Sequence, residues 1–171
     1  MTTHEKQEEN VKKLREMIKG IEVAMLTTAE DDGSLRCRPM LTLDVEFDGD
    51  LYFFTKVSAP KVDEVERDRH VCVSYVASED QRYVSMSGLA RLLRDRAKME
   101  ELWVPELKAW FPDGLKDPEL ALLWISVTQS EYWHGSSGTL VYMAGVKAMA
   151  AGMAFGDSEN EKLDLKGAGD C

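Results

Sequence analysis

The chain has 171 residues, of which 44% are hydrophobic and 30% are charged, and its formal net charge at pH 7 is −10. This length can bury a sizeable core in one domain, and the composition is that of an ordinary globular protein. The acidic charge argues against nucleic-acid or anionic-membrane partners, so any anion site must be local. The N-terminus lacks a signal-peptide core, and no apolar run is long enough to span a membrane. The three widely spaced cysteines fit no disulfide framework or zinc site, so we expect a cytoplasmic protein.

The chain opens with a predicted helix over residues 4–19. Its apolar residues repeat at helical spacing, and Thr2 with Glu5 resembles a capping box. A β-rich segment follows over residues 21–28, and Asp32-Gly33 predicts a hairpin turn.

Residues 35–47 alternate, with apolar side chains at the odd positions and Arg36 and Arg38 among the even ones. Pro39 cannot donate to a strand ladder, which indicates an edge or a bulge. A second turn at residues 48–50 leads into a short apolar strand at residues 51–54. Two hairpins in succession predict an antiparallel meander.

The rest of the chain predicts a short helix, two strands, a helical segment and two closing strands, at residues 58–69, 71–76, 81–93, 95–111, 120–133 and 139–148. Gly88 indicates a bulge or a close backbone approach. We therefore expect a mainly β domain over residues 1–152, a six- to seven-stranded antiparallel barrel with helices at its margins. Residues 153–171 are small, charged and aperiodic, and we expect a disordered tail.

A local anion site is predicted where the cations gather. Arg36 and Arg38 share one face of a strand, Lys56 lies close to a strand end, and Lys61 lies in the first turn of the helix after Ser58. A cation is poorly placed there unless an anion is bound, because a helix N-terminus already carries partial positive charge. The alternative is that Lys61 pairs with Glu64 at i,i+3 on a solvated face.

Other candidate residues have more ordinary interpretations. Trp103, Trp110 and Phe111 could line a pocket but are typical of a core, and Trp133 could cover a planar ligand or simply pack. The three histidines share no metal-ligand spacing, so we expect no metal site, and no nucleophile elbow is present.

Several short motifs together resemble the general stress protein 26 group of the pyridoxamine 5′-phosphate oxidase-like flavin-binding split barrels. Their order and spacing hold from about residue 5 to residue 150. The motifs are Arg38-Pro39-Met40, residues 48–55, Lys61-Val62, residues 83–88, Leu102-Trp103, residues 110–114 and Glu131-Tyr132-Trp133.

This resemblance implies a split barrel that binds FMN, with FAD as the alternative, in sites at a homodimer interface. It places the residues Arg38, Pro39, Met40 and Leu41 along the flavin, with the arginine near the phosphate. It places Phe54 and Thr55 at the ring, Ser58 and Lys61 at the phosphate, and Trp133 in the site of the neighbouring subunit. The activity implied is that of a flavin-dependent oxidoreductase, linked to stress response, acting on a small molecule.

The chain departs from the family pattern at three points. The serine of the phosphate loop is shifted by one position to Ser58, and Tyr83 stands where a glutamine is common. The substrate-binding segment of true pyridoxamine phosphate oxidases has no counterpart after Trp133, so we do not expect vitamin B6 synthesis. The alternatives are a non-catalytic flavin-binding stress protein, the same barrel with haem or a deazaflavin, and a dimerisation module without a cofactor.

Overall fold

The computed structural model describes residues 2–135 and 159–165. The first helix, α1 (Thr3–Ile18), begins with the predicted capping box: Thr2 Oγ1 accepts from the Glu5 amide, and the Glu5 carboxylate accepts from the Thr2 amide. Its apolar face packs Leu14 and Met17 into the core. Among the described residues, no helix is both long and apolar enough to cross a membrane.

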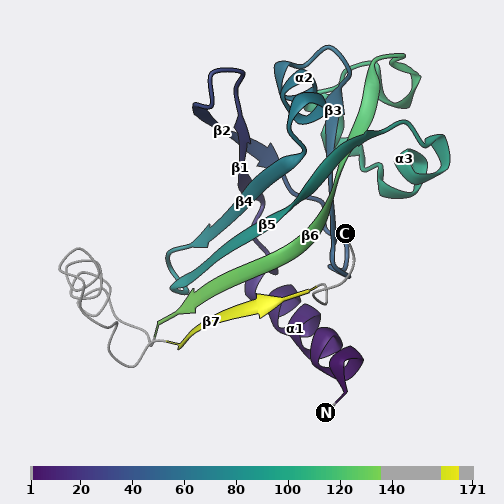
Figure 1. Cartoon of the computed structure of the whole chain (residues 1–171). Coiled ribbons are helices and arrows are strands. Elements are labelled where there is room, and N and C mark those ends of the chain that lie inside the picture. Colours follow the sequence, from purple (N-terminus) through teal and green to yellow (C-terminus); the bar gives the residue numbers. More distant parts are fainter. Residues whose placement is uncertain (1, 136–158, 166–171) are drawn as a thin grey trace.

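Seven antiparallel strands form one strongly curved sheet (Figure 1). Six of them follow the order β2-β1-β4-β5-β6-β3, and β7 pairs with β6. The mainly β, seven-stranded fold is therefore confirmed. The strands are β1 (Val23–Ala29), β2 (Leu35–Leu41), β3 (Asp50–Lys56), β4 (His70–Ala77), β5 (Arg82–Leu93), β6 (Leu120–His134) and β7 (Glu159–Asp164).

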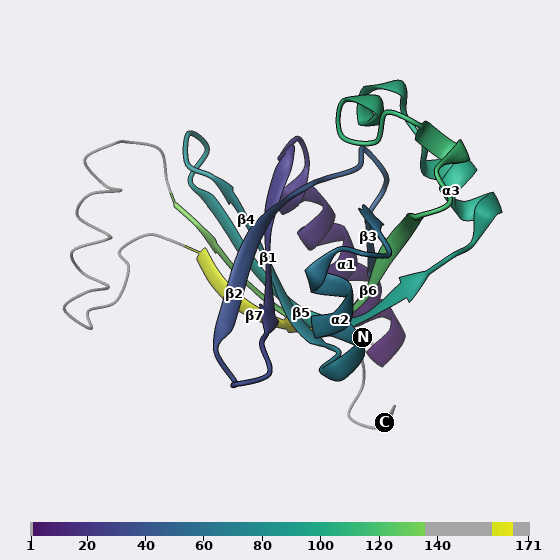
Figure 2. The same ribbon diagram turned by 90° about the horizontal axis from the view of Figure 1, so that it is seen from above.

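The predicted meander is wrong after the first hairpin. β1 and β2 form the expected hairpin, but β3 pairs with β6 instead of β2. β2 ends at Leu41, earlier than predicted, and the Thr42 amide makes one further bond to the Glu22 carbonyl beyond it. β3 then buries Leu51 and Phe53 in the barrel core at the opposite end of the strand order. The helix α2 (Pro60–Arg67) lies between β2 and β3 (Figure 2).

The edge position expected from Pro39 is confirmed, since β2 is the terminal strand of the order. Its two faces, however, do not follow a simple apolar-in pattern. Leu35 is 75% exposed, and the inward face carries Arg38 and Met40. An apolar stripe is therefore left on the outside of the sheet.

The bulge predicted at Gly88 is confirmed by a shift in the β5–β6 register between Ser87 and Gly88. The close approach is present too. A Cβ atom on Gly88 would lie 2.6 Å from the Ser126 carbonyl oxygen. The missing side chain lets β6 pass at this point.

The helical segment after β5 is shorter than predicted. α3 (Arg96–Leu102) ends before Pro105, and two short 3-10 turns follow at Pro105–Ala109 and Gly114–Lys116. Proline cannot continue an α-helix, which explains the break.

The C-terminal predictions have two outcomes. The strand expected at residues 139–148 lies outside the described residues. The expectation of a disordered tail is wrong for β7, which pairs with β6 and buries Leu163. The physical reason is that β3 covers β6 only as far as Ser126, so the rest of that edge offers unpaired backbone groups. The Asn10 side chain of α1 fixes the new strand by donating to the Asp164 carbonyl at 3.1 Å.

Candidate functional site

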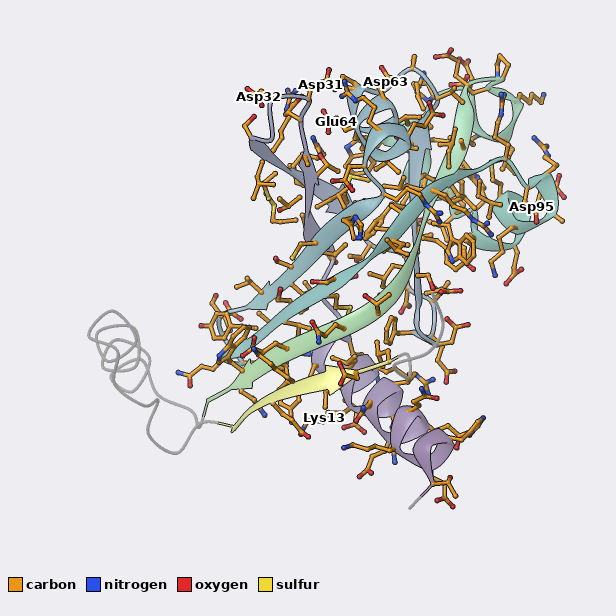
Figure 3. All side chains as sticks on the ribbon, viewed as in Figure 1. Lys13, Asp31, Asp32, Asp63, Glu64 and Asp95 are labelled. Atoms are coloured by element: carbon orange, nitrogen blue, oxygen red, sulfur yellow. The ribbon has the colours of Figure 1, made fainter. Side chains whose placement is uncertain are left out.

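A compact polar network joins β1, β2 and α2 through three side chains. The Arg38 guanidinium donates from Nη2 to Glu64 Oε2 at 2.6 Å and from Nη1 to Thr28 Oγ1 at 2.6 Å. The Thr28 hydroxyl in turn donates to Glu64 Oε2 at 2.5 Å. Glu64 lies on the side of α2 that faces the β1–β2 hairpin (Figure 3). We call this set, together with Arg36 and Lys61, the anion corner.

The anion corner follows from the periodicity of its elements. Thr28, Arg36 and Arg38 lie on the same face of the β1–β2 hairpin, because Thr28 is paired with Arg36 and side chains alternate along a strand. In α2, Val62 and Val65 are buried, and their helical spacing turns Glu64 inward with them.

Glu64 is a buried carboxylate that stays ionised. Only 2% of its side chain is exposed. Burial alone would raise its pKa, but the Thr28 hydrogen bond and the charges of Arg38 and Arg36 outweigh it, and the pKa is lowered. Arg36 contributes at longer range, with Nη1 at 4.0 Å from Glu64 Oε1 and 3.3 Å from Glu30 Oε1.

Lys61 is the unsatisfied member of the corner. Burial, and then the nearby positive Arg38, lower its pKa, while Glu64 acts in the opposite direction. Within residues 2–135 and 159–165, Lys61 makes no hydrogen bond or ion pair, so the predicted i,i+3 pair with Glu64 is not formed. The Glu64 carboxylate accepts hydrogen bonds from Arg38 and Thr28 instead. A partly buried cation beside another cation is a place where a bound anion would be stabilised.

Ser58 takes a different role from the one its position suggested. α2 begins one residue later than a Ser58 cap would place it, with Ala59 as a cap that has no side-chain bond and Pro60 in the first turn. The Ser58 hydroxyl donates to Glu119 Oε2 at 2.5 Å. The Ser58 hydroxyl would have to break this hydrogen bond to Glu119 before it could donate to a phosphate, as predicted.

An apolar flank lies at the end of β2 and on β3. Leu41 packs against a buried cluster that contains Phe54. The Phe54 ring meets Trp103 edge-on at a centroid distance of 5.5 Å and Phe111 at 6.3 Å, so these aromatics are core residues. Thr55 points to the opposite face of β3 and is 2% exposed.

The remaining predicted residues lie apart from the anion corner. Met40 belongs to the main core, and Pro39 is exposed on the outer face. Trp133 lies near the end of β6, paired with Tyr83 and Asn160. At the start of β6, Leu120 pairs with Lys56 of β3. Trp133 lies thirteen positions further along the same strand. That is roughly 40 Å of extended chain between Trp133 and the Lys56 end of β6.

The sequence reasoning missed Glu64 and Thr28 as parts of this site. The sequence predicts Glu64 only as a surface partner for Lys61, although Val62 and Val65 at helical spacing around it indicate its inward position. Thr28 carried no distinguishing signal.

Comparisons with known proteins decide the family. The model described as "Pyridoxamine 5′-phosphate oxidase like" matches residues 9–155 of the chain. The chain belongs to this family.

Solved structures support the fold of this pyridoxamine 5′-phosphate oxidase-like chain. A protein from Clostridium acetobutylicum, related to general stress protein 26, superposes with a TM-score of 0.68 at 18% identity, covering 92% of this chain and 96% of its own. The general stress FMN/FAD binding protein from Xanthomonas citri is 27% identical with a TM-score of 0.66, covering 77% of this chain and 92% of its own. The split-barrel prediction is therefore confirmed.

A curated relative, protein bli-3 from Neurospora crassa, is 30% identical over 119 residues. These residues make up 64% of this chain and 57% of that protein, so the match covers little more than half of the relative's length.

Proposed function

We propose that this chain binds FMN, with the phosphate at the anion corner and the ring toward Leu41 and Phe54. The observation that carries the proposal is Lys61, a partly buried cation with a lowered pKa beside Arg38. Around the corner, Arg36 and Arg38 pair with Glu30 and Glu64, which leaves the positive charge of Lys61 unpaired among the described residues. A phosphate monoester, with a charge of about −1.5 to −2 at pH 7, fits this excess of positive charge. The Xanthomonas citri relative, described as an FMN/FAD binding protein, supports the same ligand class.

We further propose that two copies of the chain form each site. The outer face of the sheet carries the exposed apolar residues Met25, Leu35 and Val76, and Pro39 lies beside Met25 in the β1–β2 ladder. Contiguous exposed apolar surface of this kind is typical of an interface. A partner subunit seated on this face would also bring a second Trp133, the residue that the family resemblance assigns to the site of the neighbouring subunit.

The flavin would supply hydride or single-electron transfer, and the chain's own residues would bind and orient it. Arg38 and Lys61 would hold the phosphate, and Glu64 with Thr28 would keep the guanidinium in place. Leu41 and Phe54 would exclude water from one side of the ring. On this basis we propose a cytoplasmic flavin-dependent oxidoreductase with a small-molecule substrate.

A non-catalytic flavin-binding stress protein is the second candidate. The observation that favours it is the sequence after Trp133, which contains no arginine and only one histidine, His134. Saturable oxidation of NADH or NADPH with an added acceptor would support the enzyme, and its absence would support the binder.

The visible absorption spectrum tests flavin binding itself. Purified protein is loaded with FMN and dialysed, alongside Lys61→Ala and the matched control Lys56→Ala. Lys56 is an exposed cation paired with Asp117 at 3.0 Å, outside the anion corner. We expect flavin bands in the wild type and in Lys56→Ala, and their loss in Lys61→Ala. Complete release of FMN by the wild type would refute the proposal.

A further inference from the structure

A cavity of about 710 Å³ opens between the end of α1, the loop after β2, the start of β3 and the first 3-10 turn. Its buried walls include Phe47, Leu51 and Phe53, and Trp110 stands exposed at the rim. This volume lies within the usual range of small-molecule sites, which are mostly apolar with a few placed polar groups.

One such polar group is Tyr75 of β4, which lines the cavity and is only 3% exposed. Its hydroxyl has no hydrogen-bond partner anywhere in the described part of the chain. Burial raises the pKa of Tyr75, so the hydroxyl stays protonated and remains a donor. Tyr132 is a second buried tyrosine of the core. Its hydroxyl has a hydrogen-bond partner, because it donates to Glu161 Oε2 at 3.3 Å. As a lining residue without a partner among the described residues, Tyr75 can donate a hydrogen bond to a ligand in the cavity.

The charges that line the cavity limit which kind of ligand can accept a hydrogen bond from Tyr75. The lining carries the five carboxylates of Glu22, Asp44, Glu46, Asp50 and Glu106 and two cations, Arg15 and Lys19, so carboxylates predominate. The cation Arg15 is already engaged, with Glu46 at 2.5 Å and the Phe47 carbonyl at 2.9 Å. An anionic ligand would therefore be repelled, and a neutral acceptor is favoured.

We propose that this cavity binds a small, neutral, apolar carbonyl compound whose oxygen accepts a hydrogen bond from Tyr75. The site goes beyond flavin binding and does not depend on it. Leu41 lines this cavity and also belongs to the strand assigned to the flavin, so a bound compound would lie beside that strand.

Three matched probes test the proposal on the full chain without added flavin. They are 2-acetylnaphthalene, which carries the carbonyl, 2-ethylnaphthalene, which lacks it, and 2-naphthoate, which is anionic. Dissociation constants are measured by calorimetry and ligand-observed NMR for the wild type, Tyr75→Phe and the control Tyr132→Phe. Circular dichroism verifies that each variant is folded.

We expect the ketone to bind most tightly and naphthoate most weakly. Tyr75→Phe should weaken ketone binding about five- to tenfold, the effect of one net hydrogen bond, and leave 2-ethylnaphthalene unchanged. Tyr132→Phe should change neither. Equal ketone affinity in Tyr75→Phe and wild type would overturn the proposal, as would naphthoate binding as tightly as the ketone. No saturable binding of any probe, the result expected if a second copy of the chain fills the cavity, would also overturn it.

Discussion

Arg38 and Glu64 meet across the boundary between β2 and α2, with Nη2 donating to Oε2 at 2.6 Å and only 2% of the Glu64 side chain exposed. Thr28 bonds to both of them and closes a ring of three side chains. The carboxylate is buried and ionised, so the guanidinium balances its charge and is held in one orientation by it.

Removing Glu64 should therefore destabilise the protein. Glu64→Ala leaves the mostly buried Arg38 without its counter-charge, and we expect a loss of about 3 kcal/mol in the free energy of unfolding. Glu64→Gln keeps an oxygen acceptor and should lose less. Urea denaturation measures both, with Glu66→Ala on the exposed side of α2 as a control that should stay within about 0.5 kcal/mol of wild type. Equal stabilities for all three variants would contradict a structural role for the ring.

The lowered pKa of Lys61 predicts a pH dependence of FMN binding. Phosphate binds best to the charged lysine, so affinity should be full below the pKa of the free site and fall as pH rises through it. Because that pKa is lowered, the fall should begin at a lower pH than for an ordinary lysine, whose pKa is about 10.4.

Fluorescence titrations with FMN between pH 7 and pH 10 measure this dependence. Lys61→Arg should flatten it, because a guanidinium stays charged throughout this range. An identical alkaline limb in Lys61→Arg would assign the titration to another group.

β7 should be a stabilising strand. Leu163→Ala removes a side chain that is 2% exposed in the main core, and we expect a loss of about 2–4 kcal/mol on unfolding. Lys162→Ala, exposed on the same strand, should have little effect. Equal unfolding midpoints for these two variants would show that β7 does not pack in solution.

Gly88→Ala should be disruptive because the new methyl group would lie 2.6 Å from the Ser126 carbonyl oxygen and 2.9 Å from Ile125 Cγ2. Backbone cannot move away as a flexible side chain can, so we expect a loss of at least about 2 kcal/mol. The neighbouring exposed Ser87→Ala is the control. Thermal unfolding of both variants decides between them, and a wild-type midpoint for Gly88→Ala would contradict the close approach.

The local features of the fold could be predicted because they depend on local chemistry. The capping box at Thr2, the first hairpin, the edge position of Pro39 and the bulge at Gly88 each follow from a few neighbouring residues. The pairing of β3 with β6 could not be predicted this way, because a turn signal at residues 48–50 does not determine which strand the following segment pairs with. β7 was missed because its only support is the free edge of β6, which exists only after folding.

In the candidate site, too, the features that depend on neighbouring residues could be predicted, and those that depend on long-range packing could not. Arg38 and Lys61 are recognisable in the sequence as cations near a helix start, and in the structure burial, and then the nearby positive Arg38, lower the pKa of Lys61. Glu64 and Thr28 join them from two other elements, and this depends on how α2 packs on the β1–β2 hairpin. The displacement of Ser58 toward Glu119 likewise depends on the loop before β6, which is distant in sequence.

The central claim is a flavin site shared between two copies of the chain, and mixed dimers test it most directly. Lys61→Ala and Trp133→Ala proteins, each expected to lose FMN alone, are unfolded together, refolded as a mixture and titrated with FMN. If Lys61 and Trp133 come from different subunits, random pairing restores both wild-type residues in about a quarter of the sites, and bound FMN should return at that level. If the mixture binds no more FMN than the separate variants, while refolded wild-type protein binds it fully, the shared site is contradicted.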